Sequence, residues 1–288
     1  MIYLKLVLTA VFWGGTFIAG RVVAQHVGAF SAAFFRFAIA SVCLFAYMLW
    51  KERRLPTVPK RQLGVLFLLG LTGIFAYNFF FLKGLRLIEA GRASVIVANN
   101  PIIIALLSAY FFKDRLTPTR LLAIALSVSG AIIVITHGNP LSIAQGGIGK
   151  GELYIFGCVA SWVAYSLIGK IAMKALSPLL SVTFSVFIGT ALLAVPAYWE
   201  GGIQAAPTYS LTSWAAIAYL GVFGTVLGFV WYYEGIRQIG PTRAGLFINF
   251  VPVSAILLSV IILHEPVTWS LIVGVMFVSS GVYLMNRK

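Results

Sequence analysis

The chain has 288 residues, of which 60% are hydrophobic and only 10% are charged. An ordinary soluble domain carries about 25% charged residues, so this composition excludes a water-facing surface and indicates a protein surrounded by lipid. The net charge of +14 does not indicate nucleic-acid binding, because Lys and Arg lie in small groups between long apolar runs and not on one face or arm.

Apolar runs of about 20 residues recur along the whole chain, and each is long enough to cross a bilayer as a helix. We predict an all-α polytopic membrane protein with ten transmembrane helices, the first of which is retained and not cleaved as a signal peptide. The connectors are too short to form a nucleotide-binding domain and contain no P-loop motif, which excludes ATP-driven pumping by this chain. The spans are expected at roughly 3–22, 30–50, 62–84, 91–112, 119–136, 150–171, 178–199, 212–233, 242–263 and 267–286.

The distribution of Lys and Arg among the connectors predicts the orientation of the chain. With the N-terminus in the cytoplasm, fifteen of the 21 Lys and Arg residues fall on the cytoplasmic side and five on the other, while Arg36 lies inside a span. We therefore expect a multi-pass protein of the bacterial inner membrane with both termini in the cytoplasm. That orientation requires an even number of spans, and ten satisfies it.

The chain also contains an internal repeat. Shifted by 151 residues, 69–130 aligns with 220–281 without a gap and with fifteen identities. Near the start of the chain the offset is 149 residues. Shared apolar composition explains matched glycines, prolines and arginines poorly. The matched pairs include Gly70/Gly221, Gly73/Gly224, Gly84/Gly235, Arg86/Arg237, Pro101/Pro252 and, at the smaller offset, Trp13/Trp162.

This repeat predicts two units of five helices, 1–137 and 150–288, joined by a connector at 138–149. Because five is odd, the second unit enters the membrane from the opposite side. Inverted repeats of this kind are typical of transporters, since the two copies can exchange conformations and so expose a central site to either side. The alternative is an ancient duplication that was kept only for packing.

Short motifs in this framework resemble the EamA family of the drug/metabolite transporter superfamily. The motifs are Phe12-Trp13-Gly14-Gly15-Thr16-Phe17, Arg36-Phe37, Asp114 at the end of the fourth span and His264-Glu265-Pro266 at the end of the ninth. The resemblance covers essentially the whole chain and implies ten helices around a central cavity. The first, third, fourth, sixth, eighth and ninth helices would line it, with the fifth and tenth outside. Within the family the chain is similar to bacterial amino acid exporters, including exporters of aromatic amino acids.

Asparagine and proline recur together in the fourth and ninth spans, as Asn99-Asn100-Pro101 and as Asn249 with Pro252. Each proline removes an amide donor and frees the carbonyl four residues before it. In hydrocarbon such polar groups are tolerated only against protein or a wet cavity. We interpret the two sites as polar binding points, with Pro101 and Pro252 as hinges; a kink satisfied by neighbouring helices is the alternative.

Aromatic residues form the second group of candidates. Trp13 and Trp162 lie about halfway along their helices at equivalent repeat positions, and Tyr77 with Asn78 lies near mid-depth of the third span. Aromatic walls with a few amides suit a substrate with an apolar body and a polar head. The candidate substrate-binding residues are Trp13, Thr16, Tyr77, Asn78, Phe81, Asn99, Asn100, Trp162, Tyr165, Trp231 and Asn249.

The charged residues restrict the mechanism. All seven Asp and Glu residues and all three His residues lie near loops or span ends, whereas proton relays use ionisable groups inside the membrane. Export down the substrate gradient is therefore expected. Arg36 lies about two turns inside the second helix, where it can reach the interface, attract a carboxylate or pair with another helix; we favour structural pairing.

The sequence thus predicts a facilitative exporter of amino acids, including aromatic or other hydrophobic ones, or of related metabolites, working by alternating access. The alternative is a drug or nucleoside-type efflux carrier, with or without proton coupling. An enzyme is excluded because no catalytic pair lies within the spans. The expected partners are a small-molecule substrate and the lipid bilayer, without nucleic acid, metal or cofactor, and with a monomer favoured over an obligate oligomer.

Overall fold

The computed structural model describes residues 1–53, 58–100, 102–104, 106–107, 117–139, 148–172, 175–239 and 247–286. Within these ranges the chain forms helices joined by turns, with no strand. The first half contains α1 (Ile2–His26), α2 (Ala29–Glu52), η1 (Lys60–Gln62), α3 (Leu63–Leu69), η2 (Gly70–Ala76), α4 (Tyr77–Leu87), α5 (Ala90–Val97) and α7 (Pro118–Ile135). The second half contains α8 (Lys150–Ala172), α9 (Pro178–Trp199), α10 (Gly202–Ala205), η4 (Ala206–Thr208), α11 (Leu211–Tyr219), η5 (Leu220–Leu227), α12 (Gly228–Ile239), η6 (Phe247–Asn249), α14 (Phe250–Leu263) and α15 (Trp269–Asn286).

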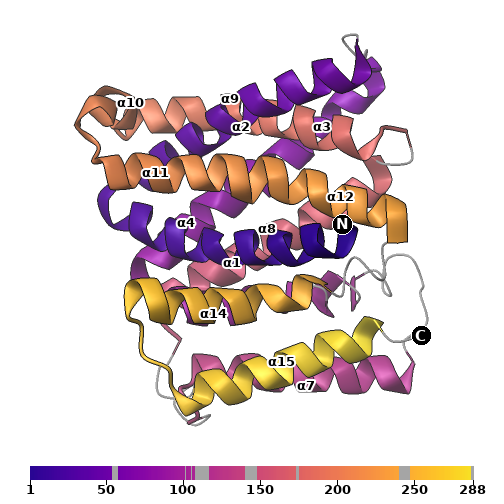
Figure 1. The fold of residues 1–288 in the computed structure, drawn as a ribbon, viewed down its shortest axis with the longest axis vertical. Coiled ribbons are helices and arrows are strands. Elements are labelled where there is room, and N and C mark those ends of the chain that lie inside the picture. The colour runs from indigo at the N-terminus through magenta and orange to yellow at the C-terminus, as the bar shows by residue number, and fades with distance from the viewer. Residues whose placement is uncertain are drawn as a thin grey trace.

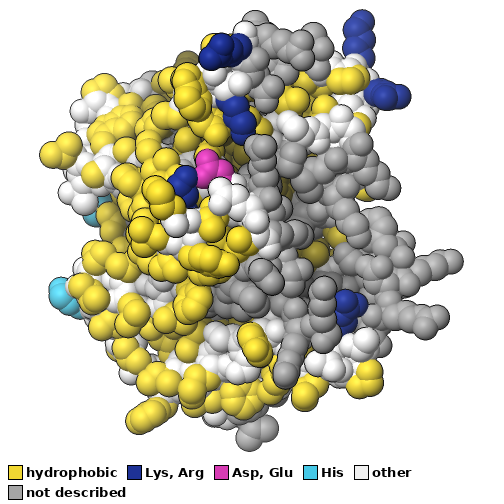
Figure 2. Space-filling model, turned by 45° about the vertical axis from the view of Figure 1, so that its right-hand side comes forward, with side chains coloured by type: hydrophobic (Ala, Val, Ile, Leu, Met, Phe, Trp, Pro, Cys, Tyr) yellow, Lys and Arg dark blue, Asp and Glu magenta, His cyan; other side chains and the backbone are white. Residues whose placement is uncertain are grey.

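Seven helical segments among the described residues are long and apolar enough to cross a membrane, and two shorter apolar helices correspond to α14 and α15. Large apolar side chains are exposed along these helices, and Figure 2 shows them covering most of the described surface on one face. The structure therefore confirms the all-α polytopic fold class. The predicted spans at 91–112 and 242–263 lie partly outside the described residues.

Local sequence signals explain where several helices begin. The side chains of Thr117 and Ser177 accept hydrogen bonds from the backbone N–H groups three residues ahead, at the start of α7 and α9. A proline follows each of them, at a helix position whose N–H has no partner within the helix. The paired capping signals thus fix the entry of the fifth and seventh predicted spans.

The third and eighth predicted spans each contain a π-helical segment at the same repeat position. Residues 70–76 form η2 within one continuous helical stretch from α3 to α4, and residues 220–227 form η5 between α11 and α12. With the offset of 151 residues, η2 corresponds to 221–227, which is all of η5 except its first residue, Leu220. π segments are rare and are frequently found at functional sites, so their repetition makes these two helices candidates for a functional role.

Close helix contacts are repeated between the two halves as well. A Cβ atom built on Gly70 would lie 2.9 Å from Cγ2 of Ile188, and one on Gly221 would lie 3.2 Å from Cγ2 of Ile39. Ile39 and Ile188 are 149 residues apart and are therefore equivalent positions of the repeat. The glycine of each half thus packs on the same isoleucine position of the other half. Two further pairs of contacts are related in the same way. Gly84 packs on Ile155 and Gly235 on Leu6, while Gly130 packs on Gly274 and Gly281 on Ala123.

The arrangement of the helices in space shows the same relation between the two halves. In Figure 1, α2 and α9 lie side by side at the top and α7 and α15 at the bottom, and both pairs are in contact. Between them, α1 packs on α12 and α14, while its repeat counterpart α8 packs on α4 and α5. The hydroxyls of Ser41 and Thr190, equivalent positions in the two halves, are 3.1 Å apart. The main hydrophobic core fills the space among α1, α2, α4, α5, α8, α9 and α11.

Candidate functional site

A cavity of about 670 Å³ lies between the two halves. Residues of α1, α4, α5, α8, α12 and α14 line it, as do η2, η5 and η6. The second and seventh predicted spans, α2 and α9, also contribute, and so do α7 and α15. α7 and α15 are the fifth and tenth predicted spans, so their place at the cavity differs from the expectation that these two helices lie outside it. They pack on each other closely through Gly130 and Gly281, and the end of this pair flanks the cavity.

The cavity extends toward the end of the bundle where α1 begins. It reaches Arg120 in the first turn of α7, Ile248 in η6 and Val282 near the end of α15. In Figure 1 the start of α1 and the end of α15 lie at the same end of the bundle. At this end the side chains of Lys5 and Glu234 join α1 to α12, with Nζ 2.6 Å from Oε2.

Aromatic rings from both halves form one wall of the cavity. The ring centroids of Trp13 and Tyr232 are 5.3 Å apart, and those of Trp13 and Phe229 are 5.7 Å apart. Trp162, the repeat counterpart of Trp13, lies 5.2 Å from Tyr77 and 5.4 Å from Tyr165. Trp13 Nε1 also donates to the backbone carbonyl of the η5 residue Gly224 at 3.0 Å. Such tilted contacts are favourable for aromatic pairs, so the wall is held in place by its own packing.

The structure brings most of the predicted site residues together. Phe81 lies elsewhere, stacked on Tyr77 and edge-on to Phe17 in the core. Trp231 packs against Phe12, and neither it nor Asn99 is among the lining residues. Pro101 and the side chain of Asn249 lie outside the described residues. The predicted residues that do line the cavity are Trp13, Thr16, Tyr77, Asn78, Asn100, Trp162, Tyr165 and the hinge candidate Pro252.

The fourth predicted span is interrupted at its asparagine pair. Helix α5 ends at Val97, and Ala98 and Asn99 form a turn. The Asn99 side chain donates through Nδ2 to the carbonyl of Val95 at 3.0 Å, so it caps the end of the helix. Asn100 is 6% exposed and lines the cavity, and its Oδ1 atom has no hydrogen-bond partner in the described part of the chain.

The described part of the ninth predicted span begins with a 3₁₀ turn. The short 3₁₀ turn η6 precedes α14, and Pro252 lies in the first turn of that helix. A proline is tolerated there because the first backbone N–H groups of a helix have no partner within it. Pro252 therefore lies at the start of α14, beside the cavity that it lines.

For Arg36 the sequence favours structural pairing, and the structure gives it partners on two other helices as well as a place at the cavity. Arg36 is 7% exposed, lines the cavity and connects helices of both halves. Its Nη1 donates to Oδ1 of Asn78 at 2.8 Å, while Nε and Nη2 lie 3.4 and 3.3 Å from Oγ1 of Thr225. Asn78 in turn donates to the carbonyl of Ile74 in η2, and Thr225 to that of Leu220 in η5. Arg36 thus joins the two π segments through neutral partners.

Among the described residues that line the cavity, the charged side chains are Arg36 and Arg120, and none is Asp, Glu or His. The acidic groups with described contacts lie elsewhere. Glu200 accepts hydrogen bonds from the backbone and hydroxyl of Ser31, and Glu152 pairs with Arg92 at 2.9 Å. A cleft with charges of one sign focuses its field on ligands of the opposite sign, so this cavity favours anionic groups.

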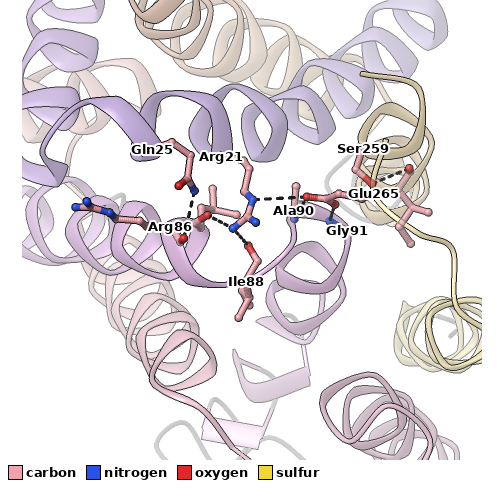
Figure 3. A network of polar contacts seen from close by, with 10 residues as sticks. Arg21, Gln25, Arg86, Ile88, Ala90, Gly91, Ser259 and Glu265 are labelled. Atoms are coloured by element: carbon pink, nitrogen blue, oxygen red, sulfur yellow. Dashed lines mark hydrogen bonds and ion pairs between the residues drawn. The ribbon is translucent and has the colours of Figure 1, made fainter. Parts of the chain in front are cut away.

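The end of the bundle opposite the start of α1 is closed by a polar network (Figure 3). Arg21 of α1 donates through Nη1 to the carbonyls of Leu85 and Ile88, at 2.7 and 2.6 Å, where α4 ends. Glu265, after α14, accepts from the backbone N–H groups of Ala90 and Gly91 at the start of α5, at 2.9 and 3.2 Å. The cation of Arg21 thus lies at the C-terminal end of α4 and the anion of Glu265 at the N-terminal end of α5, so each charge complements the dipole of its helix. Nε of Arg21 and Oε1 of Glu265 are 3.7 Å apart.

A bundle of apolar helices with an internal cavity that extends toward one end, and a polar network across the other end, fits a multi-pass membrane transporter. Residues 1–136 and 149–287 match the EamA-like transporter family. The chain belongs to this family. Its members are transporters, which confirms the family resemblance and the prediction that the chain is not an enzyme.

Comparisons with individual proteins agree with this assignment. The chain is 28% identical to the uncharacterized transporter YyaM of Bacillus subtilis, over 98% of this chain and 92% of that protein. It is also 28% identical to a probable terminal-alkyne amino-acid exporter of Streptantibioticus cattleyicolor, again over 98% and 92%. A solved crystal structure with 20% sequence identity matches 99% of this chain and 97% of its own, with a TM-score of 0.67, which shows a shared fold.

Proposed function

We propose that the chain crosses the bacterial inner membrane ten times as two inverted five-helix repeats, with both termini in the cytoplasm. The matching π segments and the glycine contacts that exchange between the halves support this topology. The excess of Lys and Arg in the connectors on the N-terminal side supports the orientation. In this orientation the cavity faces the cytoplasm and the network of Figure 3 closes the opposite side.

Labelling of two equivalent positions tests this topology. Thr117 and Thr268 are 151 residues apart, both are exposed, and both precede a helix. We expect an impermeant thiol reagent to label Thr117→Cys only from the cytoplasmic side and Thr268→Cys only from the other, in a chain whose Cys43 and Cys158 are replaced by Ala. Labelling of both positions from one side would contradict the inverted repeat.

We further propose that the protein exports amino acids with aromatic or other hydrophobic side chains by alternating access. The observation that carries this proposal is the cavity between the halves, with aromatic rings on one wall and a few polar groups of Arg36, Asn78 and Asn100. An apolar body fits the rings and a polar head fits the amides and the guanidinium. The relative described as a probable amino-acid exporter supports the same substrate class.

Export down the substrate gradient, without proton coupling, is the transport mode that the cavity favours. A proton-coupled carrier needs a group that titrates within the transport path. None of the described lining residues is Asp, Glu or His, the side chains that usually carry protons in such relays. The substrate alone is therefore expected to drive the conformational exchange.

Counterflow in liposomes tests both proposals. Purified protein is reconstituted into liposomes with a high internal concentration of one unlabelled amino acid. Entry of the labelled compound is measured by its label, and a pH dye inside the vesicles reports the luminal pH at the same time. We expect exchange of Phe, Trp or Leu with no stoichiometric change in luminal pH. Exchange of none of the amino acids, together with transport of a nucleoside or a cationic drug, would overturn the substrate class. A matched pH change would overturn the facilitative mode.

A further inference from the structure

We infer that Arg36 binds the carboxylate of the substrate, so that the cavity selects molecules with a carboxylate and an apolar body and does not require an amino group. The inference rests on the proposed function and deepens it. It makes the carboxylate the group that decides which amino acid analogues are transported.

The bonding of Arg36 is the first argument. A guanidinium has five N–H donors in a planar fork that matches a carboxylate. Three of them have partners in the described part of the chain, and two of those three bonds share the single hydroxyl of Thr225 at 3.3 and 3.4 Å. The partners are neutral, and the described residues give Arg36 no ion pair. A buried cation with spare donors and no counter-charge favours an anionic ligand.

A second, independent feature of the same cavity points to a ligand. Asn100 is more than nine-tenths buried and lines the cavity, and its Oδ1 has no partner among the described residues. A buried amide without a partner is costly unless a ligand or water completes it. Arg36 and Asn100 come from different helices of the first half, and both line the same cavity.

The asymmetry between the repeats is the third argument. The helix packing around the cavity is repeated in both halves, but the arginine site is present once. With the offsets of 149 and 151 residues, Ser185 takes the place of Arg36, Phe229 that of Asn78, and Ile74 that of Thr225. At the equivalent positions the structure therefore has neither a cation nor the two polar partners of Arg36. A charge that packing does not require, at the wall of a transport cavity, is best explained by the ligand that it binds.

Three ligands that differ only in their head group test the inference in the wild-type protein. Phenylalanine carries both charges, 3-phenylpropanoate lacks the amine, and phenethylamine lacks the carboxylate. Each is tested as a competitor of labelled phenylalanine, or of whichever amino acid exchanges best, in counterflow. We expect 3-phenylpropanoate to compete at least about tenfold better than phenethylamine, because charge-assisted hydrogen bonds to the carboxylate are lost in the amine.

Variants then assign the preference to this residue. Arg36→Gln is expected to compress the difference between acid and amine to less than about threefold, because the charge is lost while a shorter, neutral hydrogen-bonding side chain remains. Arg36→Lys is expected to keep part of the preference, since it keeps the charge without the planar fork. Arg86→Gln removes an exposed arginine of α4 and is the matched control, with an unchanged preference. Gel filtration and the melting temperature verify that each variant is folded.

The outcomes separate this inference from the proposed function. Phenethylamine competing as well as 3-phenylpropanoate in the wild type would overturn the role of the carboxylate, even if Arg36→Gln did not fold, and would leave amino acid transport standing. An acid preference that survives in Arg36→Gln would overturn the assignment to Arg36. Failure of every amino acid and analogue to exchange in the wild type would overturn the proposed function and this inference with it.

Discussion

The network that closes the bundle in Figure 3 yields a quantitative prediction about conformational exchange. Glu265 belongs to the second half and caps α5 of the first, and its side chain is only 10% exposed. The end that it closes must separate before the cavity can open there. We expect Glu265→Gln to favour that opening, because the amide keeps the size of the side chain but loses the charge on both hydrogen bonds.

The size of the effect follows from these contacts. Each of the two hydrogen bonds to the carboxylate contributes at least about 1.5 kcal/mol, and the Gln carbonyl retains one neutral bond of about 1 kcal/mol, so at this lower bound the closed state loses about 2 kcal/mol. At 1.4 kcal/mol per factor of ten, the population open at this end rises about 30-fold. The ion pair with Arg21 adds little to this figure, since the two side chains are 3.7 Å apart and Arg21 is 26% exposed.

Cysteine accessibility measures this change. Ser94 lies one turn below the capped end of α5 and lines the cavity, so Ser94→Cys reports entry from the side of Glu265. The rate of modification by an impermeant reagent added on that side follows the open population. Glu234→Gln is the matched control, because its pair with Lys5 is about one-third exposed and lies at the other end. It should change the rate less than about fivefold. A rate in Glu265→Gln within the range of this control would refute the reasoning.

Two further predictions concern the aromatic wall and the repeated glycines. Trp162→Ala removes a ring of the cavity wall and should raise the half-saturation concentration for transport about fivefold. Trp231→Ala, which removes a tryptophan outside the cavity, should leave it unchanged; equal effects of the two variants would contradict the assignment of the wall. Gly73→Ala places a methyl group on the ring of Tyr165 and should lower the free energy of unfolding by about 1–3 kcal/mol. Gly64→Ala, with no atom within 4 Å of the added carbon, should be neutral or slightly stabilising in a thermal unfolding assay, and equal losses in both variants would refute the contact.

Part of the site was predictable because the repeat constrains it. Trp13 and Trp162 are equivalent and lie at mid-helix, and the structure finds both at the cavity. Asn100 was predictable for another reason, since a polar residue beside a proline has few stable positions within hydrocarbon. Both signals are local or periodic, so they can be read along the chain without knowledge of the helix neighbours.

The remaining site residues depend on which face of each helix turns inward. A soluble helix reveals its inner face by amphipathicity, but a membrane helix is apolar on both faces. For this reason Phe81 and Trp231 were predicted beside the cavity, although the structure packs them against the core and against Phe12. A mid-helix position does not distinguish these faces.

The sequence by itself determined the class of this protein, through apolar runs of bilayer length, charges gathered in connectors and at span ends apart from Arg36, and Gly and Pro residues matched between the halves. Only the tertiary structure decided the position of Arg36. Its partners Asn78 and Thr225 are 42 and 189 residues away in the chain. A buried charge is explained by the groups that surround it in space, and no periodicity along the chain predicts neighbours at such separations.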